Sequence, residues 1–475
     1  MIELSFFEGF VVAVLGLGKS GLAAAEALQR SGAEVWAWDD NEDTRARARA
    51  AGINLVDLYR ASWDEPVTLV ISPGIPHEHP APHPVAALAR EHKVEIIGEI
   101  ELLGRADPDA RYVGVTGTNG KSTTTALIGH ILQLSGRQVD VGGNLGTPAT
   151  ALERVGMDGI HVLEMSSYAL EITFSITFDV AVLLNITPDH LERHGGMAGY
   201  VAAKRNIFRR QSRPRTAVIG VDDETCRAIH RELLEAGHQV VRPISAERAV
   251  AGGVYVLDGA LYDDSEGQAV PALDLREVAT LPGRHNWQNA AAAYAACRAI
   301  GLDGATAAAC IRSFAGLPHR QELVETIEGI AYVNDSKATN ADAAAKALAC
   351  YDAIYWIVGG RAKETGLSGL EPWFGHVVEA FLIGESEPAF AAFLEGKLPY
   401  RRCGDLATAL AAATEAARRD GRPGAVVLLS PACASFDQFA SFEQRGDLFR
   451  EAVAAIPGTR GEPAALAAPA AGGTA

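Results

Sequence analysis

The sequence predicts an α/β protein with mainly parallel sheets, divided into three domains and a tail. At about 100–200 residues per domain, a chain of 475 residues has room for three. Short β-branched apolar runs alternate with alanine-rich helical segments through most of the chain, which is typical of strand–helix units in parallel sheets. Breaks in this alternation place the domains at residues 1–100, 101–317 and 318–461. The Ala/Pro/Gly-rich segment 462–475 is expected to be a disordered tail.

Composition and charge disfavour several functional classes. The formal net charge of -17 argues against non-specific binding of nucleic acid, which requires a basic face. Glu3 and Glu8 interrupt the apolar N-terminal segment, and no uncharged apolar run reaches the roughly 18 residues of a membrane span. The six cysteines form no CxxC pair, as expected of reduced thiols. We therefore expect a cytoplasmic protein without a membrane span or a nucleic-acid partner. A monomer is expected as well, although composition does not bear on the oligomeric state.

The first domain opens with a glycine-rich loop between a strand and a helix. The strand ends at Leu15, the loop has glycines in the pattern GxGxxG over residues 16–21, and a helix is expected from Leu22 to Ser31. Asp39 ends the next strand, which completes the dinucleotide fingerprint of a Rossmann-like domain. The pattern favours a nucleotide held by backbone N–H groups. A tight turn without a ligand is the alternative, and the fingerprint alone does not identify the ligand as NAD.

The second domain carries a phosphate-binding loop. Residues 114–123, GVTGTNGKST, follow the strand Tyr112–Val115 and begin a helix near Lys121. In such a loop, backbone amides surround a triphosphate, the lysine reaches its outer phosphates, and a hydroxyl such as that of Ser122 can hold Mg²⁺. Val115 stands where the strict GxxxxGK[ST] pattern has glycine, so this loop is a variant. A purely structural glycine-rich turn is the alternative.

Polar residues follow two further strands of this domain. Glu164 ends the strand at Ile160, and a carboxylate there is placed to hold Mg²⁺ beside a phosphate-binding loop. Otherwise it is a solvated strand end. His190 follows the strand at Val180 and is either a ligand of a second Mg²⁺, a phosphate contact or a structural histidine.

Two more segments of this domain leave their roles open. Lys204, in a helix expected to start at Tyr200, binds phosphate, carries a carbamate or lies on the surface. The segment His285–Asn289, HNWQN, precedes an alanine-rich helix. Its amides either read an adenine edge or cap that helix.

Taken together and in chain order, these segments resemble the Mur ligase family, whose members join amino acids to UDP-linked sugar peptides. The resemblance is carried by GTNGKST at 117–123, ExSS at Glu164, NITPDHLERH at 185–194, AAK at Lys204 and HNWQN at 285–289. It covers nearly the whole chain except the tail. It implies a Rossmann-like N-terminal domain, a central P-loop ATPase-like domain and a C-terminal Rossmann-like domain.

In the third domain, the resemblance is to the family members that add D-glutamate. It rests on NDSKATN at 334–340, SPACASFDQF at 430–439 and FEQRG at 442–446. Phe436 is a departure, because the family usually has leucine there. The implied substrates are UDP-N-acetylmuramoyl-L-alanine, D-glutamate and ATP, joined through an acyl phosphate with release of ADP and phosphate.

The resemblance also implies a set of site residues. Those for ATP are Gly117, Thr118, Asn119, Gly120, Lys121, Ser122, Thr123, Asn289, Arg320 and Asp335. Those for the UDP part are Gly16, Leu17, Gly18, Lys19, Ser20, Asp39, Asp40, Ser72, Gly74 and Asn144. Those for D-glutamate are Thr339, Lys363, Ser435 and Phe442. Two Mg²⁺ ions would be held by Ser122, Glu164, His190 and a carbamylated Lys204, and the catalytic set would be Lys121, His190, Lys204 and Lys337.

Three other functions compete with this one. Another Mur-type ligase or a folylpolyglutamate synthase would share the phosphate-binding loop, but the segment 430–446 argues against both. An NAD-dependent oxidoreductase would explain the first loop and leave the second loop and Glu164 without a role. A nucleotide-binding switch would bind ATP without turnover that depends on an amino acid.

Overall fold

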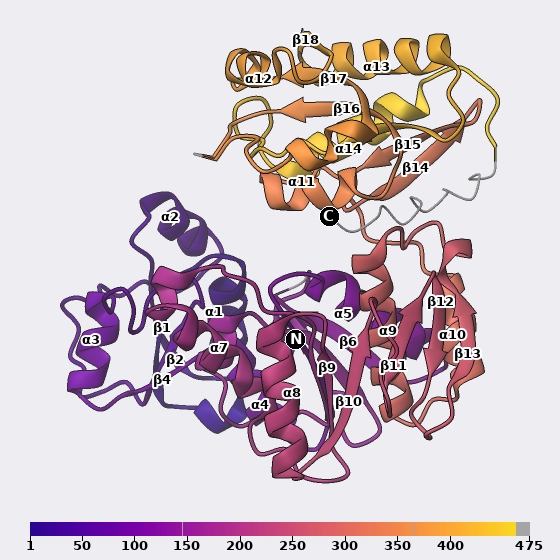
Figure 1. The fold of residues 1–475 in the computed structure, drawn as a ribbon. Helices are drawn as coiled ribbons and strands as arrows, with labels where there is room; N and C mark the ends of the chain where they lie inside the picture. Colours follow the sequence, from indigo (N-terminus) through magenta and orange to yellow (C-terminus); the bar gives the residue numbers. More distant parts are fainter. Residues whose placement is uncertain (145, 364, 462–475) are drawn as a thin grey trace. The chain divides into compact units, whose positions relative to one another are not determined.

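The computed structural model describes residues 1–144, 146–363 and 365–461, and within them the chain is an α/β protein with largely parallel sheets (Figure 1). The prediction of the α/β class is therefore confirmed. The described strands form three sheets, of four, nine and six strands. The chain divides into two compact units, of which the first contains residues 1–257, 261–272 and 288–311 and the second most of the remainder. The predicted tail, 462–475, lies outside the described residues.

The four-stranded sheet is parallel, in the order β2-β1-β3-β4. Its strands are β1 (Val11–Leu15), β2 (Glu34–Trp38), β3 (Thr68–Ile71) and β4 (Glu95–Ile97). Its helices are α1 (Lys19–Arg30), α2 (Glu42–Ala50), α3 (Pro84–Glu91) and α4 (Glu99–Ala106). Leu15 is in register with both Trp38 and Ile71. Parallel strands that end in register bring the residues that follow them to one edge, so the loops after β1, β2 and β3 meet there.

The nine-stranded sheet has the order β13-β12-β11-β10-β9-β8-β5-β7-β6 in the described part of the chain. Its strands are β5 (Arg111–Thr116), β6 (Val139–Gly143), β7 (Ile160–Glu164), β8 (Val180–Leu183), β9 (Thr216–Gly220), β10 (Val240–Ser245), β11 (Val254–Leu257), β12 (Ala260–Asp263) and β13 (Val270–Asp274). Glu164 is in register with Val115 and Gly143, and Thr116 with Leu183. The loops after β5, β6, β7 and β8 therefore share one edge.

Helices accompany this sheet along the chain. They are α5 (Lys121–Leu134), α6 (Ser167–Glu171), α7 (Met197–Arg205), α8 (Glu224–Ala236), α9 (Arg284–Ala299) and α10 (Gly304–Arg312). The short 3-10 helices of the chain are η1 (Ser5–Phe7), η2 (Ala149–Ala151), η3 (Leu191–His194), η4 (Asn206–Phe208), η5 (Leu275–Glu277) and η6 (Glu371–His376). No described helix is both long and apolar enough to cross a membrane.

The six-stranded sheet has the order β14-β15-β19-β16-β17-β18 among the described residues. Its strands are β14 (Glu322–Ile327), β15 (Ile330–Asn334), β16 (Ala353–Gly359), β17 (Val377–Ile383), β18 (Tyr400–Gly404) and β19 (Ala425–Leu429). Its helices are α11 (Ala341–Leu348), α12 (Glu387–Leu394), α13 (Leu406–Asp420) and α14 (Phe442–Ala454). One core contains α11 and α12 residues and the other contains α13 and α14 residues, so the sheet is covered on both faces.

Three sequence-based expectations need correction. The segment 285–289 does not precede the alanine-rich helix but lies within it, because α9 begins at Arg284. The N-cap role considered for Asn286 and Asn289 is therefore wrong. Lys204 lies in the last turn of α7, which begins before Tyr200. The last sheet is not wholly parallel, because β14 and β15 form an antiparallel pair across a two-residue turn.

Candidate active site

The residues predicted to bind ATP phosphates form the loop between β5 and α5. Gly120 is the N-cap of α5 and has a φ of 87°, a left-handed conformation that favours glycine. The first N–H groups of a helix have no partner within the helix, and the helix dipole makes that end attractive to anions. The loop conformation and the helix together therefore make a phosphate cradle.

The side chain of Lys121, the first residue of α5, folds back over the phosphate loop. Its Nζ donates hydrogen bonds to Gly117 O and to Thr118 O, each at 2.9 Å. The ammonium group is thus held beside the phosphate cradle, where it can neutralise the charge of a bound phosphate. The phosphate-binding role of Lys121 stays a prediction.

Asn185, at the end of β8, fixes the loop from the neighbouring strand. Its Oδ1 accepts from the N–H of Asn119 at 2.9 Å, and its carbonyl accepts from the N–H of Thr118 at 2.9 Å. Sequence reasoning gave Asn185 no role. The available signal was its position directly after a buried strand that pairs with the strand of the phosphate loop.

Asn289 lies against the phosphate loop from α9. A Cβ built on Gly120 would stand 2.2 Å from Asn289 Oδ1, so the two residues are in close contact. Only 2% of Asn289 is exposed, which leaves its amide little room to move. Asn289 was predicted to bind ATP, and the structure brings it to the loop predicted to bind the same ligand.

Glu164 presents a carboxylate oxygen beside the phosphate loop. The residue is 2% exposed, and its Oε1 accepts from Asn144 Nδ2 at 2.7 Å. Its Oε2 is buried and has no hydrogen-bond partner among the described residues. A buried carboxylate oxygen without a donor suits a divalent cation, because oxygen ligands are those that Mg²⁺ prefers. The alternative of a solvated strand end is therefore wrong.

Metal-binding groups are otherwise sparse. The described residues contain no group of three or more His, Cys, Asp or Glu side chains that could hold a metal ion. Mg²⁺ at phosphate sites is usually held by one or two carboxylates, with water and phosphate oxygens completing its shell. The surroundings of Glu164 fit that kind of site.

Lys204 is buried, and the alternative of a surface lysine is wrong. It is 1% exposed, its Nζ donates to Gly117 O at 2.8 Å, and it lies 4.7 Å from the centre of the Tyr200 ring. Burial, with a smaller contribution from the positive charge of Lys121, lowers the pKa of Lys204 to about 7. Near neutral pH a large share of this amine is uncharged and nucleophilic.

His190 is exposed at the same edge of the sheet. Its side chain is 54% exposed, and its Nε2 lies 3.4 Å from Asp189 Oδ2. Its ring lies 5.3 Å from that of Tyr168. His190 is the N-cap of η3 and has a left-handed backbone, with a φ of 51°. The imidazole is accessible to a ligand.

The glycine-rich loop of the first sheet is held by two predicted residues. Asp39 Oδ2 accepts from the N–H of Leu17 at 2.7 Å, and Ser72 Oγ donates to Gly16 O at 2.9 Å. A Cβ on Gly21 would stand 1.7 Å from Gly16 O, so the fingerprint glycine is needed for close packing. Asp39 therefore supports the backbone of the loop. In a dinucleotide site, by contrast, the acidic residue at this position binds the ribose hydroxyls.

Neighbouring residues extend this site. Tyr59 Oη donates a hydrogen bond to Asp40 Oδ1 at 3.0 Å, and His83 Nε2 lies 3.0 Å from Asp40 Oδ2. Neither Tyr59 nor His83 was predicted from the sequence. Lys19 Nζ donates to Gly146 O, which connects the first loop to the segment that follows Asn144. The residues predicted for the UDP part thus lie in loops that contact one another.

The remaining predicted residues belong to the second unit, and two of them, Lys337 and Phe442, lie beside Ser336. Arg445, 1% exposed, donates from Nε to Ser336 Oγ at 2.9 Å and from Nη2 to Cys433 O at 3.1 Å. Ser336 Oγ donates in turn to Phe442 O at 2.8 Å, and Lys337 Nζ lies 5.4 Å from the Phe442 ring centre. Arg445 was quoted only as part of a motif, yet it holds the segments of Lys337 and Phe442 together.

Asp335 is a buried carboxyl group in the same unit. Ser430 Oγ donates to its Oδ2 at 2.8 Å, and the N–H of Gln321 donates to its Oδ1 at 3.2 Å. Burial raises the pKa of Asp335 to about 7, and these donors oppose the shift only in part. The predicted ATP residues are divided between the units, with Lys121 and Asn289 in the first and Arg320 and Asp335 in the second.

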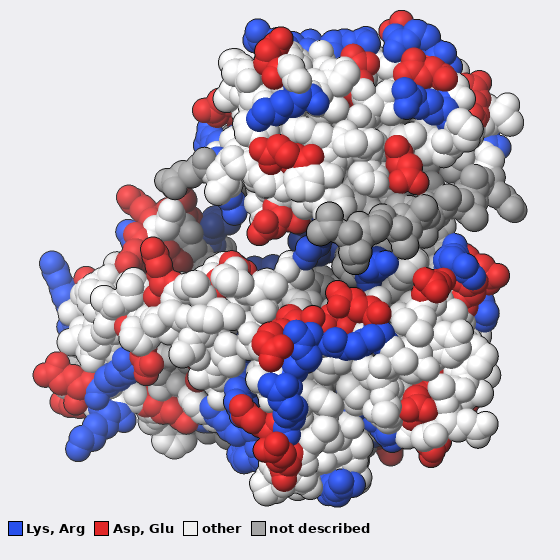
Figure 2. Space-filling view, viewed as in Figure 1, with Lys and Arg blue, Asp and Glu red and all other residues white. Residues whose placement is uncertain are grey.

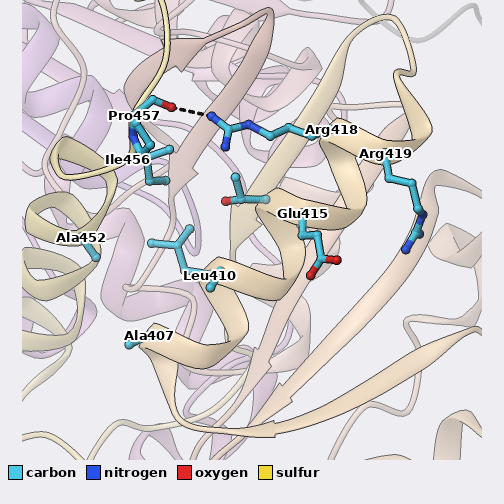
Figure 3. A pocket seen from close by; sticks show the side chains of 10 residues that line it. Ala407, Leu410, Glu415, Arg418, Arg419, Ala452, Ile456 and Pro457 are labelled. Carbon is cyan, nitrogen blue, oxygen red and sulfur yellow. Dashed lines mark hydrogen bonds between the residues drawn. The ribbon is translucent and has the colours of Figure 1, made fainter.

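Two surface features lie apart from these residues. Figure 3 shows a groove in the second unit, lined by Leu410, Ile456 and other residues of α13 and the end of α14, where Arg418 donates to Pro457 O. It contains no predicted site residue. On the face seen in Figure 2, acidic and basic side chains are interspersed.

Comparison with known proteins identifies relatives over nearly the whole chain. The model of the Mur ligase middle domain matches residues 115–297. A UDP-N-acetylmuramoylalanine–D-glutamate ligase of Rhodospirillum rubrum is 54% identical over 97% of this chain and 98% of its own. One of the same name from Caulobacter sp. is 50% identical over 98% of this chain and 99% of its own.

A structural comparison agrees. The crystal structure of UDP-N-acetylmuramate–alanine ligase from Thermotoga maritima has a TM-score of 0.56 at 18% identity, covering 94% of this chain and 99% of that one. At that identity it supports the fold alone. The identity to the full-length relatives decides the family: the chain belongs to the Mur ligase family and, within it, to the group of UDP-N-acetylmuramoylalanine–D-glutamate ligases.

Proposed function

We propose that the protein is an ATP-dependent C–N ligase that joins D-glutamate to UDP-N-acetylmuramoyl-L-alanine during synthesis of peptidoglycan precursors. The observation that carries the proposal is the phosphate loop at Lys121 with the unpaired Glu164 carboxylate oxygen beside it. Relatives that match nearly the whole chain are named for this reaction.

The reaction requires activation of a carboxylate. An amine does not displace oxygen from a carboxylate in water, because the oxygen is a poor leaving group. Transfer of the γ-phosphoryl group of ATP to the free carboxylate of the nucleotide substrate gives an acyl phosphate and ADP. The amine of D-glutamate then attacks the acyl carbon, phosphate leaves and the amide forms. Because every reactant is an anion, catalysis consists mainly of positioning and charge neutralisation.

Residues of the first unit would perform the phosphoryl transfer. The amides at the start of α5 and the ammonium of Lys121 bind the triphosphate, and Asn289 fixes the loop at Gly120. Glu164 and Ser122 would hold one Mg²⁺, and His190 with a modified Lys204 a second. Mg²⁺ supplies charge neutralisation at phosphate oxygens.

We propose that Lys204 carries a carbamate. Its uncharged amine attacks CO₂ and loses a proton, which converts a cation into an anion. The low pKa of Lys204, caused by burial and by Lys121, favours the uncharged amine that this addition needs. An anionic carbamate also suits a second metal ion beside anionic phosphates, whereas an ammonium there would be repelled.

The substrates would be divided among three domains with boundaries at residues 1–100, 101–317 and 318–461. The loops after β1, β2 and β3 would bind the UDP part, aided by Asn144. The segments carrying Thr339, Lys363, Ser435 and Phe442 would bind D-glutamate, with Lys337 near the reacting phosphate. We further propose that the protein acts as a monomer in the cytoplasm, where its nucleotide substrates are made.

One assay tests this function against its competitors. The purified protein is incubated with ATP, Mg²⁺ and UDP-N-acetylmuramoyl-L-alanine, and phosphate release is compared across L- and D-amino acids. Release that requires D-glutamate supports the proposal. Release with another amino acid, or with a folate substrate, would replace it with a related ligase. ATP binding without any amino-acid-dependent release would indicate a nucleotide-binding switch instead.

A further inference from the structure

A largely buried ionic cluster joins the first two sheets, and the proposed reaction does not use it. The cluster consists of Arg193, Glu171, His77 and His194, and we call it the Arg193 cluster. Arg193, His77 and His194 are 8%, 7% and 3% exposed. Arg193 Nη1 lies 3.5 Å from Glu171 Oε2, and His194 Nδ1 lies 2.8 Å from Glu171 Oε1.

Burial shifts the ionisation of three groups in the cluster. Burial lowers the pKa of His77 and that of His194 to about 4, so both imidazoles are uncharged near neutral pH. The ion pair of the cluster is therefore Arg193 with Glu171. Burial raises the pKa of Glu171 to about 7, against the opposing charge of Arg193, so this carboxyl group is only partly ionised near neutral pH. In its ionised form the Glu171 carboxylate can only accept, so His194 Nδ1 then donates to it and His194 Nε2, 2.9 Å from Ser167 Oγ, accepts from that hydroxyl.

The cluster connects loops that carry predicted substrate residues. Arg193 Nη2 donates to Ile75 O at 3.2 Å and to His77 Nδ1 at 3.1 Å. Ile75 closes a turn on Ser72, because its N–H donates to Ser72 O at 2.9 Å. The backbone N–H of Arg193 donates to His190 O at 3.1 Å. Arg193 thus links the turn after β3, which its guanidinium contacts, to His190, which its backbone N–H contacts and which was predicted to bind Mg²⁺.

Stability alone does not account for such a group. Placing a charged guanidinium in the interior is costly, and a well-packed apolar pair often serves a fold as well. Moreover, Arg193 Nε and Nη1 have no hydrogen-bond partner among the described residues, so the pairing is incomplete. What the guanidinium provides that an apolar side chain cannot is a directional link from Ile75 O to the start of η3.

We propose that Arg193 is a positioning residue for the nucleotide substrate. It holds the Ser72–Ile75 turn against the segment that begins at His190, so that substrate bound by the first sheet presents its carboxylate to the phosphate loop. The inference rests on the proposed function, because it assumes that the UDP part is bound at the loops of the first sheet. It assigns Arg193 no contact with substrate.

The test is Arg193→Lys, which keeps a charge for Glu171 but lacks the planar fork that also reaches Ile75 O and His77. We expect the KM for UDP-N-acetylmuramoyl-L-alanine to rise at least about tenfold, as for loss of a charge-assisted hydrogen bond. The KM for ATP should change by less than about twofold, because the phosphate loop does not depend on this link. Glu171→Gln should shift the same two values in the same directions.

The matched control is Arg105→Lys. Arg105 pairs with Glu95 at 2.7 Å and with Glu101, which is nearly fully buried, at 2.9 Å. Thermal unfolding and direct binding of ATP are measured for every variant. The inference would be overturned if the KM for the nucleotide substrate rose in proportion to the loss of thermal stability, and by the same proportion in Arg193→Lys and Arg105→Lys. Equal rises in both KM values would also overturn it.

If Arg193→Lys does not fold, Glu171→Gln decides the question by the same criteria. Failure of the proposed function has a different signature. In that case the unchanged protein would release no phosphate with D-glutamate, whatever the variants do.

Discussion

Replacement of Gly120 by alanine tests how the phosphate loop is shaped. The left-handed backbone at Gly120, with φ of 87°, costs an alanine about 1–2 kcal/mol. The added Cβ would also stand 2.2 Å from Asn289 Oδ1, in a side chain that is 2% exposed. Moving that buried amide from its partners costs about 1–3 kcal/mol more. We expect Gly120→Ala to weaken ATP binding at least about tenfold, equivalent to about 1.4 kcal/mol.

The control lies at the other end of the same helix. Gly136 follows α5 and has a φ of 76°, but a Cβ there would meet nothing within 4 Å. Gly136→Ala therefore reproduces the backbone strain without the contact to Asn289. Calorimetric titration with ATP and thermal unfolding are measured for both variants. We expect thermal unfolding to show a similar loss of stability in both variants, and titration to show weakened ATP binding only in Gly120→Ala. Unchanged ATP affinity in Gly120→Ala would refute the reasoning.

Three further predictions concern charged groups. Lys121→Ala should lower kcat at least about 10²-fold, the usual cost of losing one charge-stabilising donor, and near-normal turnover would contradict the role of the loop. Lys204→Ala should be poorly active and partly recovered by a short-chain carboxylate, whereas full activity without it would remove the carbamate proposal. Because the pKa of Asp335 is raised to about 7, the folded state binds a proton at this residue more tightly than the unfolded state does. The contribution of Asp335 to stability should therefore fall as pH rises from about 4 to 7. Denaturant midpoints across that range should fall less steeply with pH for Asp335→Asn than for the unchanged protein, and parallel curves would exclude this contribution.

Local patterns were enough to predict the strands that carry the site. The loops after Leu15 and Thr116 were both placed correctly, because a buried strand, glycines and a helix follow one another within a few residues. Register then brings Glu164 to the edge of the phosphate loop, which the parallel-sheet prediction already implied. Such features depend on residues close in sequence and on general sheet geometry.

Contacts between distant residues were not visible in the sequence. Arg445 bonds to Ser336, 109 positions away, and Tyr59 bonds to Asp40 across two loops. The burial of Lys204 likewise depends on packing of α7 against the phosphate loop, so a surface position could not be excluded in advance. The antiparallel strand β14 was missed because its two glutamates, Glu322 and Glu325, break up its apolar run and resemble an exposed loop.

The central claim is that the γ-phosphoryl group of ATP moves to the carboxylate of the nucleotide substrate. It can be tested by labelling that carboxylate of UDP-N-acetylmuramoyl-L-alanine with a heavy oxygen isotope and analysing the phosphate released on reaction with ATP and D-glutamate. Formation of an acyl phosphate predicts that one labelled oxygen leaves with the phosphate and the other stays in the new amide. Amide product whose accompanying phosphate carries no label would contradict it.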